Sequence, residues 1–114
     1  MIYHINNGVL IKCEFGKNET VAIVPNTVRR IASGAFCSKP ATFITLPDGV
    51  VELDAGAIEG CRDLAVITLP YTIQKIAMGA IKYNGLNTII RVPANLSYTN
   101  EIALTTYGAH LVKY

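Results

Sequence analysis

Apolar and polar positions repeat along this chain with a period of about 23 residues. Four prolines mark the period, because Pro25, Pro47, Pro70 and Pro93 are 22, 23 and 23 residues apart. Apolar residues stand three and one positions before each proline, at Ala22 and Val24, Ile44 and Leu46, Ile67 and Leu69, and Ile90 and Val92. Nine positions after each of the first three prolines begins a Gly-Ala-apolar triplet: Gly34-Ala35-Phe36, Gly56-Ala57-Ile58 and Gly79-Ala80-Ile81. The agreement predicts a solenoid, whose successive coils stack and bury an apolar side that one coil could not bury alone.

Each unit has one strand-like run directly before its proline. Proline cannot donate a hydrogen bond to a strand ladder, so we expect the strand to end there. The predicted strands cover residues 21–24, 42–46, 65–69 and 88–92. Stacking would place them in parallel, about 4.8 Å apart, in one small continuous sheet. We expect the Gly-Ala-apolar triplets on the opposite, convex side, on a helical turn or tight bend where small residues let neighbouring coils approach.

Both ends of the chain carry patterns typical of caps. Asn6-Asn7-Gly8 lies between two strand-like runs at residues 2–5 and 9–13, and Asn-Gly is a strong signal for a β-hairpin. Residues 107–112 read as a last strand that closes the stack. The chain is thus predicted to form one domain, with a hairpin cap at 1–18, about three and a half coils at 19–104 and a cap strand at 105–114.

The units resemble the BspA-like class of leucine-rich repeat. Residues 57–70 match that family's A-F-x-x-C-x-x-L-x-x-I-x-I-P pattern, with Ile58 in place of Phe. The resemblance covers residues 19 to about 104, and residues 7–12 look like the lead-in of such proteins. The first unit is one residue short, the third has Asn84 in the Cys place, and the last keeps only Ala103 and Leu104 of the triplet. The resemblance implies a mostly-β α/β repeat, a short leucine-rich-repeat solenoid, that serves as a recognition surface for other proteins.

Strand alternation also predicts which side chains face away from the core. If the residues one and three before each proline face inward, those two and four before face outward. The candidate protein-binding residues are therefore Ile23, Thr45, Thr68 and Arg91 in one row, and Val21, Phe43, Val66 and Ile89 in the other. The second row is apolar in every unit, although the family usually has small or polar residues there.

An exposed apolar row of this kind would reach the few hundred Å² that soluble monomers seldom expose. Its burial could contribute several kcal/mol at about 25 cal/mol per Å². We expect either a binding face for another protein or a homodimer interface. The alternatives are that Tyr or Lys side chains or the C-terminal tail cover the row, or that the strand register is shifted by one residue.

Composition narrows the functional classes. The 114 residues are 51% hydrophobic and 16% charged, which excludes intrinsic disorder. A net charge of +2 is too small to indicate binding to nucleic acid or to a membrane surface. The N-terminus lacks the pattern of a signal peptide, and no apolar run could span a bilayer, so the predicted localisation is cytoplasmic. The odd number of cysteines, Cys13, Cys37 and Cys61, favours reduced thiols in the core over disulfides or zinc ligands.

No residue pattern indicates catalysis. Sequence motifs for phosphate, dinucleotide, zinc-protease and serine-hydrolase sites are absent. His4 and His110 lie in opposite caps, the acidic residues near the second unit suit turns, and Arg29, Arg30 and Lys75 form a modest basic spot beside Glu52. We therefore expect no catalytic residue, metal, cofactor or small-molecule substrate. The prediction is a non-enzymatic protein-interaction module, an adaptor or a small inhibitor of another protein, and the alternative is a structural repeat protein that forms homodimers.

Overall fold

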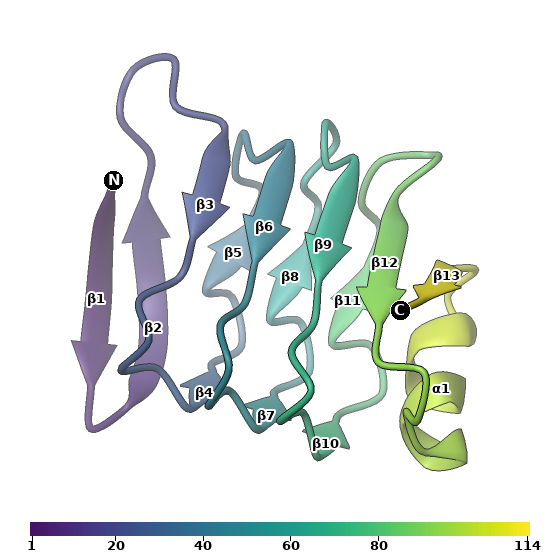
Figure 1. Ribbon diagram of the computed structural model, residues 1–114. Helices are drawn as coiled ribbons and strands as arrows, with labels where there is room; N and C mark the ends of the chain where they lie inside the picture. Colours follow the sequence, from purple (N-terminus) through teal and green to yellow (C-terminus); the bar gives the residue numbers. More distant parts are fainter.

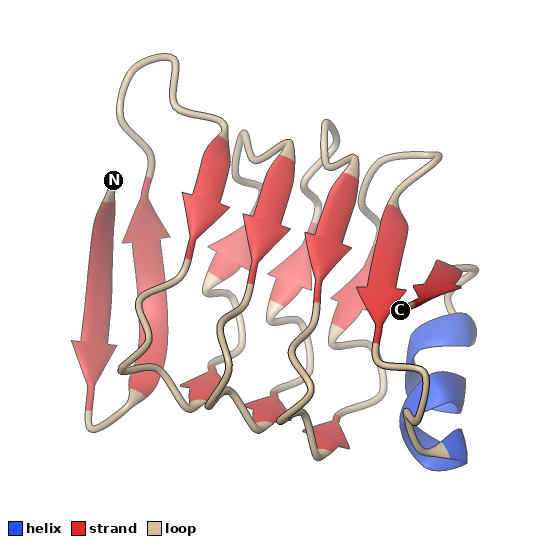
Figure 2. Cartoon of the chain, viewed as in Figure 1, coloured by secondary structure: helices blue, strands red, loops and turns tan.

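Each complete coil contributes one short strand to each of three sheets, so the stack has three sides. The computed structural model describes residues 1–114, and Figures 1 and 2 show the coils following one another from the N-terminal hairpin to a single helix. We call the sheets front, lower and rear, after their places in Figure 1. The front sheet contains β3 (Val21–Ile23), β6 (Phe43–Thr45), β9 (Val66–Thr68), β12 (Ile89–Val92) and β13 (His110–Lys113).

The other two sheets use even shorter strands. The lower sheet contains β4 (Arg30–Ile31), β7 (Glu52–Leu53) and β10 (Lys75–Ile76), joined to the N-terminal hairpin. The rear sheet contains β5 (Phe36–Cys37), β8 (Ile58–Glu59) and β11 (Ile81–Lys82). The predicted solenoid with a parallel sheet is confirmed, and its front strands lie within the predicted ranges. The lower and rear strands were not predicted, and the single continuous sheet of the prediction is replaced by three.

The core lies inside the triangular stack and is built from equivalent positions of successive coils. Ala22, Ile44, Ile67 and Ile90 point inward from the front sheet, Ile31, Leu53 and Ile76 from the lower sheet, and Phe36, Ile58 and Ile81 from the rear sheet. Because strand partners in successive coils are 22 or 23 residues apart, each buried side chain packs on its own counterpart in the next coil. The period seen in the sequence is therefore the path length of one coil.

The glycine of each triplet makes the corner between the lower and rear sheets. Gly34, Gly56 and Gly79 have φ angles of 78°, 70° and 75°, in the left-handed region that a side chain disfavours. A Cβ added to Gly34 would meet no atom within 4 Å. The expectation that glycine lets neighbouring coils approach is therefore wrong at this position, where the backbone angle explains glycine. The tight bend itself is observed, but it leads into a strand.

The hairpin predicted at the N-terminus is confirmed. Strand β1 (Ile2–Asn6) pairs antiparallel with β2 (Val9–Glu14), and β2 continues into the lower sheet by parallel pairing with β4. Asn7 and Gly8, between the two strands, have φ angles of 49° and 77°, as a type I′ turn requires. The hairpin covers the first coil, and the N-terminal ammonium forms an ion pair with Glu19 at 2.6 Å.

The C-terminal end is closed by two elements. The predicted last strand is present as β13, shifted toward the C-terminus, and it pairs in parallel with β12. Helix α1 (Tyr98–Thr105) was not predicted; it begins after Ser97, whose hydroxyl accepts a hydrogen bond from the Asn100 amide. This helix is not long and apolar enough to cross a membrane.

Asn100 connects α1 to the lower sheet. Its side-chain oxygen accepts from the amide of Ile76 at 2.9 Å, and its side-chain nitrogen donates to the carbonyl of Gln74 at 2.9 Å. These backbone groups belong to the last lower strand and to the residue before it, and a further coil would otherwise pair them. One buried side chain thus takes the place of a missing strand at this edge.

The cysteines are all free, but they differ in environment. Cys13 and Cys61 are buried, as predicted, and their thiols donate to the carbonyls of Ala35 and Phe36. Cys37 is exposed on the rear sheet, so the prediction of a core thiol is wrong there. Phe36 points inward, and strand alternation turns the next residue to solvent.

Candidate protein-binding face

The front sheet presents two straight rows of side chains to solvent. The parallel register aligns Val21, Phe43, Val66, Ile89 and His110 in the first row. The second row, aligned in the same way, consists of Ile23, Thr45, Thr68, Arg91 and Val112. The inward-facing residues of each strand lie between the two rows. All eight candidate residues therefore face outward, as predicted.

The first row is apolar across four strands. Val21 and Phe43 are 51% and 47% exposed, Ile89 is exposed to a smaller extent, and Val66, between two long neighbours, is half-buried. In the second row Ile23 is 69% exposed, and the two threonines follow it along the sheet. The N-terminal half of the face is therefore the more apolar half.

The C-terminal residue lies at the border of this face and leaves the first row uncovered. The Tyr114 hydroxyl donates to the carbonyl of Leu69, and its ring packs edge-on against Tyr71 at a centroid distance of 5.0 Å. Burial raises the pKa of the Tyr114 phenol, which keeps the donating proton in place. Since the tail contacts the Arg91 end of the second row and not the apolar row, it does not provide the cover considered as an alternative.

Arg91 is the one residue in these two rows with a permanent charge. Its guanidinium lies 5.2 Å from the centre of the Tyr114 ring and takes part in none of the five ion pairs of the structure. His110, at the end of the first row, is also exposed. The face thus combines an apolar half with a cationic end that has no acidic partner within the chain.

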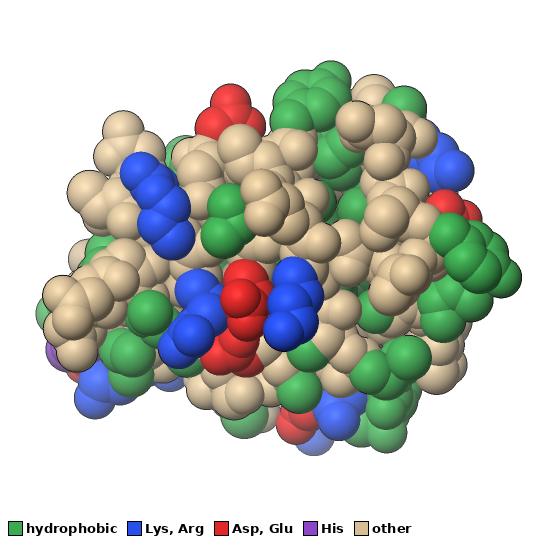
Figure 3. All heavy atoms as spheres, turned by 90° about the horizontal axis from the view of Figure 1, so that it is seen from below, with side chains coloured by type: hydrophobic (Ala, Val, Ile, Leu, Met, Phe, Trp, Pro, Cys, Tyr) green, Lys and Arg blue, Asp and Glu red, His purple; other side chains and the backbone are tan.

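The basic spot predicted near Arg29, Arg30 and Lys75 is largely neutralised. Arg30, Glu52 and Lys75 are in register on the lower sheet, so their charges alternate in sign, and Arg30 also forms an ion pair with Asp54 at 3.5 Å. Figure 3 shows acidic side chains between basic ones on this side of the molecule. Arg29 donates to the carbonyls of Asn26 and Val28. This arrangement suits a solvated surface.

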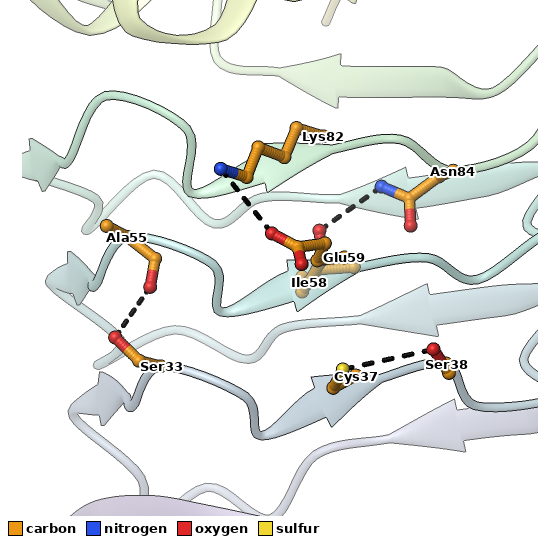
Figure 4. Close-up of polar contacts among 8 residues, drawn as sticks. All are labelled: Ser33, Cys37, Ser38, Ala55, Ile58, Glu59, Lys82 and Asn84. Atoms are coloured by element: carbon orange, nitrogen blue, oxygen red, sulfur yellow. Dashed lines mark hydrogen bonds and ion pairs between the residues drawn. The ribbon is translucent and has the colours of Figure 1, made fainter.

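The rear sheet carries polar contacts between coils. Glu59 and Lys82 form an ion pair at 3.5 Å, and Ser33 donates to the carbonyl of Ala55, as Figure 4 shows. Asn84 occupies the Cys position of the repeat, accepts from the Cys61 amide and donates to the Ile58 carbonyl. These side chains hold the coils in register.

The remaining candidate groups are not assembled into a catalytic constellation. His4 pairs with Glu14 on the hairpin, and His110 lies on the front sheet, while the thiols of Cys13 and Cys61 are in the core. Burial raises the pKa of both buried thiols, to about 11 for Cys13, so they stay protonated near neutral pH.

His110 and Val112 belong to the face but were missed in the sequence. They follow α1, and no proline comes after their strand, so the proline-based repeat does not mark them. The signal that could have found them is the alternation around Leu111, which is more buried than either neighbour.

The repeat pattern also identifies the chain among known proteins. The family model for the BspA type leucine-rich repeat region matches residues 5–110, in six copies, so the repeat extends beyond the predicted three and a half coils into both caps. Neither a curated protein sequence nor a solved structure matches the chain. The match covers most of the chain and agrees with the stacked coils and with the resemblance in residues 57–70. This chain therefore belongs to the BspA-type leucine-rich repeat family.

Proposed function

We propose that the chain binds another protein through the front sheet and has no catalytic role of its own. Leucine-rich repeats generally mediate protein interactions. The observation that supports this site is the exposed row Val21, Phe43, Val66 and Ile89, which crosses four strands without cover from the chain itself. Contiguous exposed apolar side chains are one mark of a protein-interaction surface.

The two halves of the face suit different parts of a partner. Val21, Ile23 and Phe43 would bury apolar side chains of the partner, which supplies affinity. Arg91, on the same face and free of ion pairs, would receive a carboxylate, which supplies specificity and orientation. The partner would then present an apolar surface with an acidic residue at one end.

The proposal includes both an adaptor and a small inhibitor. The two differ in their effect on the activity of the bound partner. An inhibitor would lower the activity of an enzyme partner in proportion to occupancy, whereas an adaptor would leave that activity unchanged. A homodimer formed through the front sheet is the alternative use of the same residues. Light scattering would then show a dimer in the parent chain that is lost in the variant Phe43→Asp with Val66→Asp.

The test is a double substitution, Phe43→Asp with Val66→Asp, in the intact chain. We expect the affinity for a partner captured from cells that express the chain, then purified, to fall at least about tenfold, equivalent to about 1.4 kcal/mol. The matched control is Ile2→Asp with Ile11→Asp, which places two acidic residues at exposed apolar positions of the hairpin. Circular dichroism and thermal melting should match the parent chain in both variants.

An unchanged affinity in the front-sheet variant contradicts the proposal. An equal loss in both variants also contradicts it, because the effect would then come from added charge and not from the face.

A further inference from the structure

A second apolar surface lies at the C-terminal end of the stack. It adjoins the front sheet at His110, which lines the same hollow as Tyr83, Leu86 and Tyr107. Six large exposed side chains form it, and we call them the end patch: Met78, Tyr83, Leu86, Tyr98, Ile102 and Tyr107. Leu86 is 97% exposed and Tyr98 is 78% exposed. In Figure 3 apolar side chains gather at the same end of the molecule, on the right of the view.

The members of the end patch are connected through shared neighbours. Met78, Tyr98 and Ile102 line one hollow beside α1. Tyr83 and Tyr107 pack edge to face at 5.7 Å, and both line a second hollow with Leu86. The Tyr107 ring also lies close to Gly79, the residue that follows Met78 in the chain. The two hollows are therefore neighbours.

Backbone groups at this end also lack partners. In earlier coils the amide of Gly56 donates to the carbonyl of Gly79, and the amide of Gly60 to that of Lys82. The equivalent amides of the last rear coil, at Gly79 and Tyr83, have no acceptor in the structure. Asn100 and β13 close the lower and front sheets, but no strand follows β11 in the rear sheet. The end patch therefore lies around an open edge of the rear sheet.

The size of the end patch is close to that of one side of a stable interface. At roughly 200 Å² for a fully exposed side chain of this size, the exposed fractions of its six members amount to about 700 Å². A standard protein interface buries about 800 Å² from each partner. A second copy of this chain can supply the same area by presenting the same patch.

The charges next to the end patch permit this arrangement. A twofold axis places identical surfaces opposite each other, so unpaired like charges would repel. Lys82 and Glu101, the charged residues adjacent in sequence to the patch, are both in ion pairs, with Glu59 at 3.5 Å and with Lys113 at 3.5 Å. Their charges are neutralised within each copy.

We propose that two copies of this chain associate through their end patches in a twofold-symmetric dimer, which leaves the apolar N-terminal half of each front sheet free. The dimer presents two partner-binding faces at once, so a multivalent partner would be held more tightly than by one copy. This proposal does not depend on the front sheet binding a partner.

The test is the mass of the intact chain by sedimentation equilibrium, over concentrations from about 10 μM to 1 mM. We expect a reversible monomer–dimer equilibrium within this range. Leu86→Asp with Tyr98→Asp should weaken the dimer at least tenfold, whereas the front-sheet variant Phe43→Asp with Val66→Asp should leave it within twofold of the parent. Both patch positions are exposed, and Asp at the first residue of α1 favours the helix, so the patch variant should fold.

A second measurement needs no substitution. Amide hydrogen exchange at high and low concentration should show slower exchange in the dimer at residues 78–86 and 98–107, and no change at residues 21–23 and 43–45. A parent chain that remains monomeric throughout overturns the proposal. A dimer that persists in the patch variant, or that is lost in the front-sheet variant, overturns it as well.

Discussion

Single backbone positions decide how each coil turns. An L-residue with a side chain disfavours the left-handed conformation by about 1–2 kcal/mol, and Gly34, Gly56 and Gly79 avoid that cost at the corner they share. In the fourth unit the equivalent residue is Ile102, and there the chain forms α1 in place of the corner. The loss of one glycine thus accompanies the end of the repeat.

The three thiols should differ sharply in reactivity. Burial raises the pKa of Cys13 to about 11 and also raises that of Cys61, so neither thiolate forms to a useful extent at pH 8. Cys37 is exposed. We expect one rapidly modified thiol per folded chain, measured with a chromogenic disulfide reagent, and none in Cys37→Ser.

Urea-unfolded protein provides the reference, since all three thiols should then react at similar rates. Two or more rapidly reacting thiols in the folded chain would contradict the burial of Cys13 and Cys61.

At the end of the lower sheet, Asn100 should contribute more to stability than an exposed asparagine. Asn100→Leu removes both hydrogen bonds and leaves the buried amide of Ile76 unpaired, which typically costs about 1–3 kcal/mol. We expect a loss of about 2 kcal/mol in the free energy of unfolding in urea. Asn100→Asp keeps the acceptor for Ile76 but places a buried carboxylate oxygen against the carbonyl of Gln74, so we expect a comparable loss.

Asn95→Leu is the matched control, because Asn95 is exposed in the preceding turn, and we expect a change within about 0.5 kcal/mol. Equal effects of the two leucine substitutions would show that Asn100 does not cap the sheet edge.

The strands differ in how well sequence reasoning could find them. The front strands have three or four residues and a proline close behind, so their alternation and their ends are visible. The lower and rear strands have two residues each, one inward and one outward, which is too short to show a period. The buried stripe of α1 has helical spacing, but its first member is the polar Asn100, which hides the pattern of apolar residues.

The candidate binding face could be predicted from the alternation of the front strands. Register and alternation determine which side chains point outward, so the eight residues of the four repeated strands could be predicted. The end patch could not, because its members come from a helix, a turn and loops that only the folded chain brings together.

The stack should tolerate the removal of one whole coil. Deletion of residues 48–70 joins Pro47 to Tyr71, which reproduces the Pro70–Tyr71 junction and lets β4, β5 and β6 pair with β10, β11 and β12. We expect a folded protein whose free energy of unfolding is lower by at least about 2 kcal/mol, since one coil-to-coil interface is lost. Circular dichroism shows whether the shortened chain is folded, and urea unfolding measures its free energy of unfolding.

Deletion of residues 48–58 is the control, because it removes about half a coil, including β7 and Ile58, and leaves that coil without a lower strand. We expect that chain to be unfolded. If the whole-coil deletion also fails to fold, the coils are not interchangeable units.

Nearly all backbone hydrogen bonds between coils lie along the stacking axis and join each coil to the next. Tension applied to the two ends of the stack, along the stacking axis, would break the hydrogen bonds between one pair of coils at a time. The coils would therefore separate stepwise at low force. Tension across a single layer would shear several bonds together and meet greater resistance. The molecule is thus mechanically anisotropic, weak lengthwise and strong crosswise.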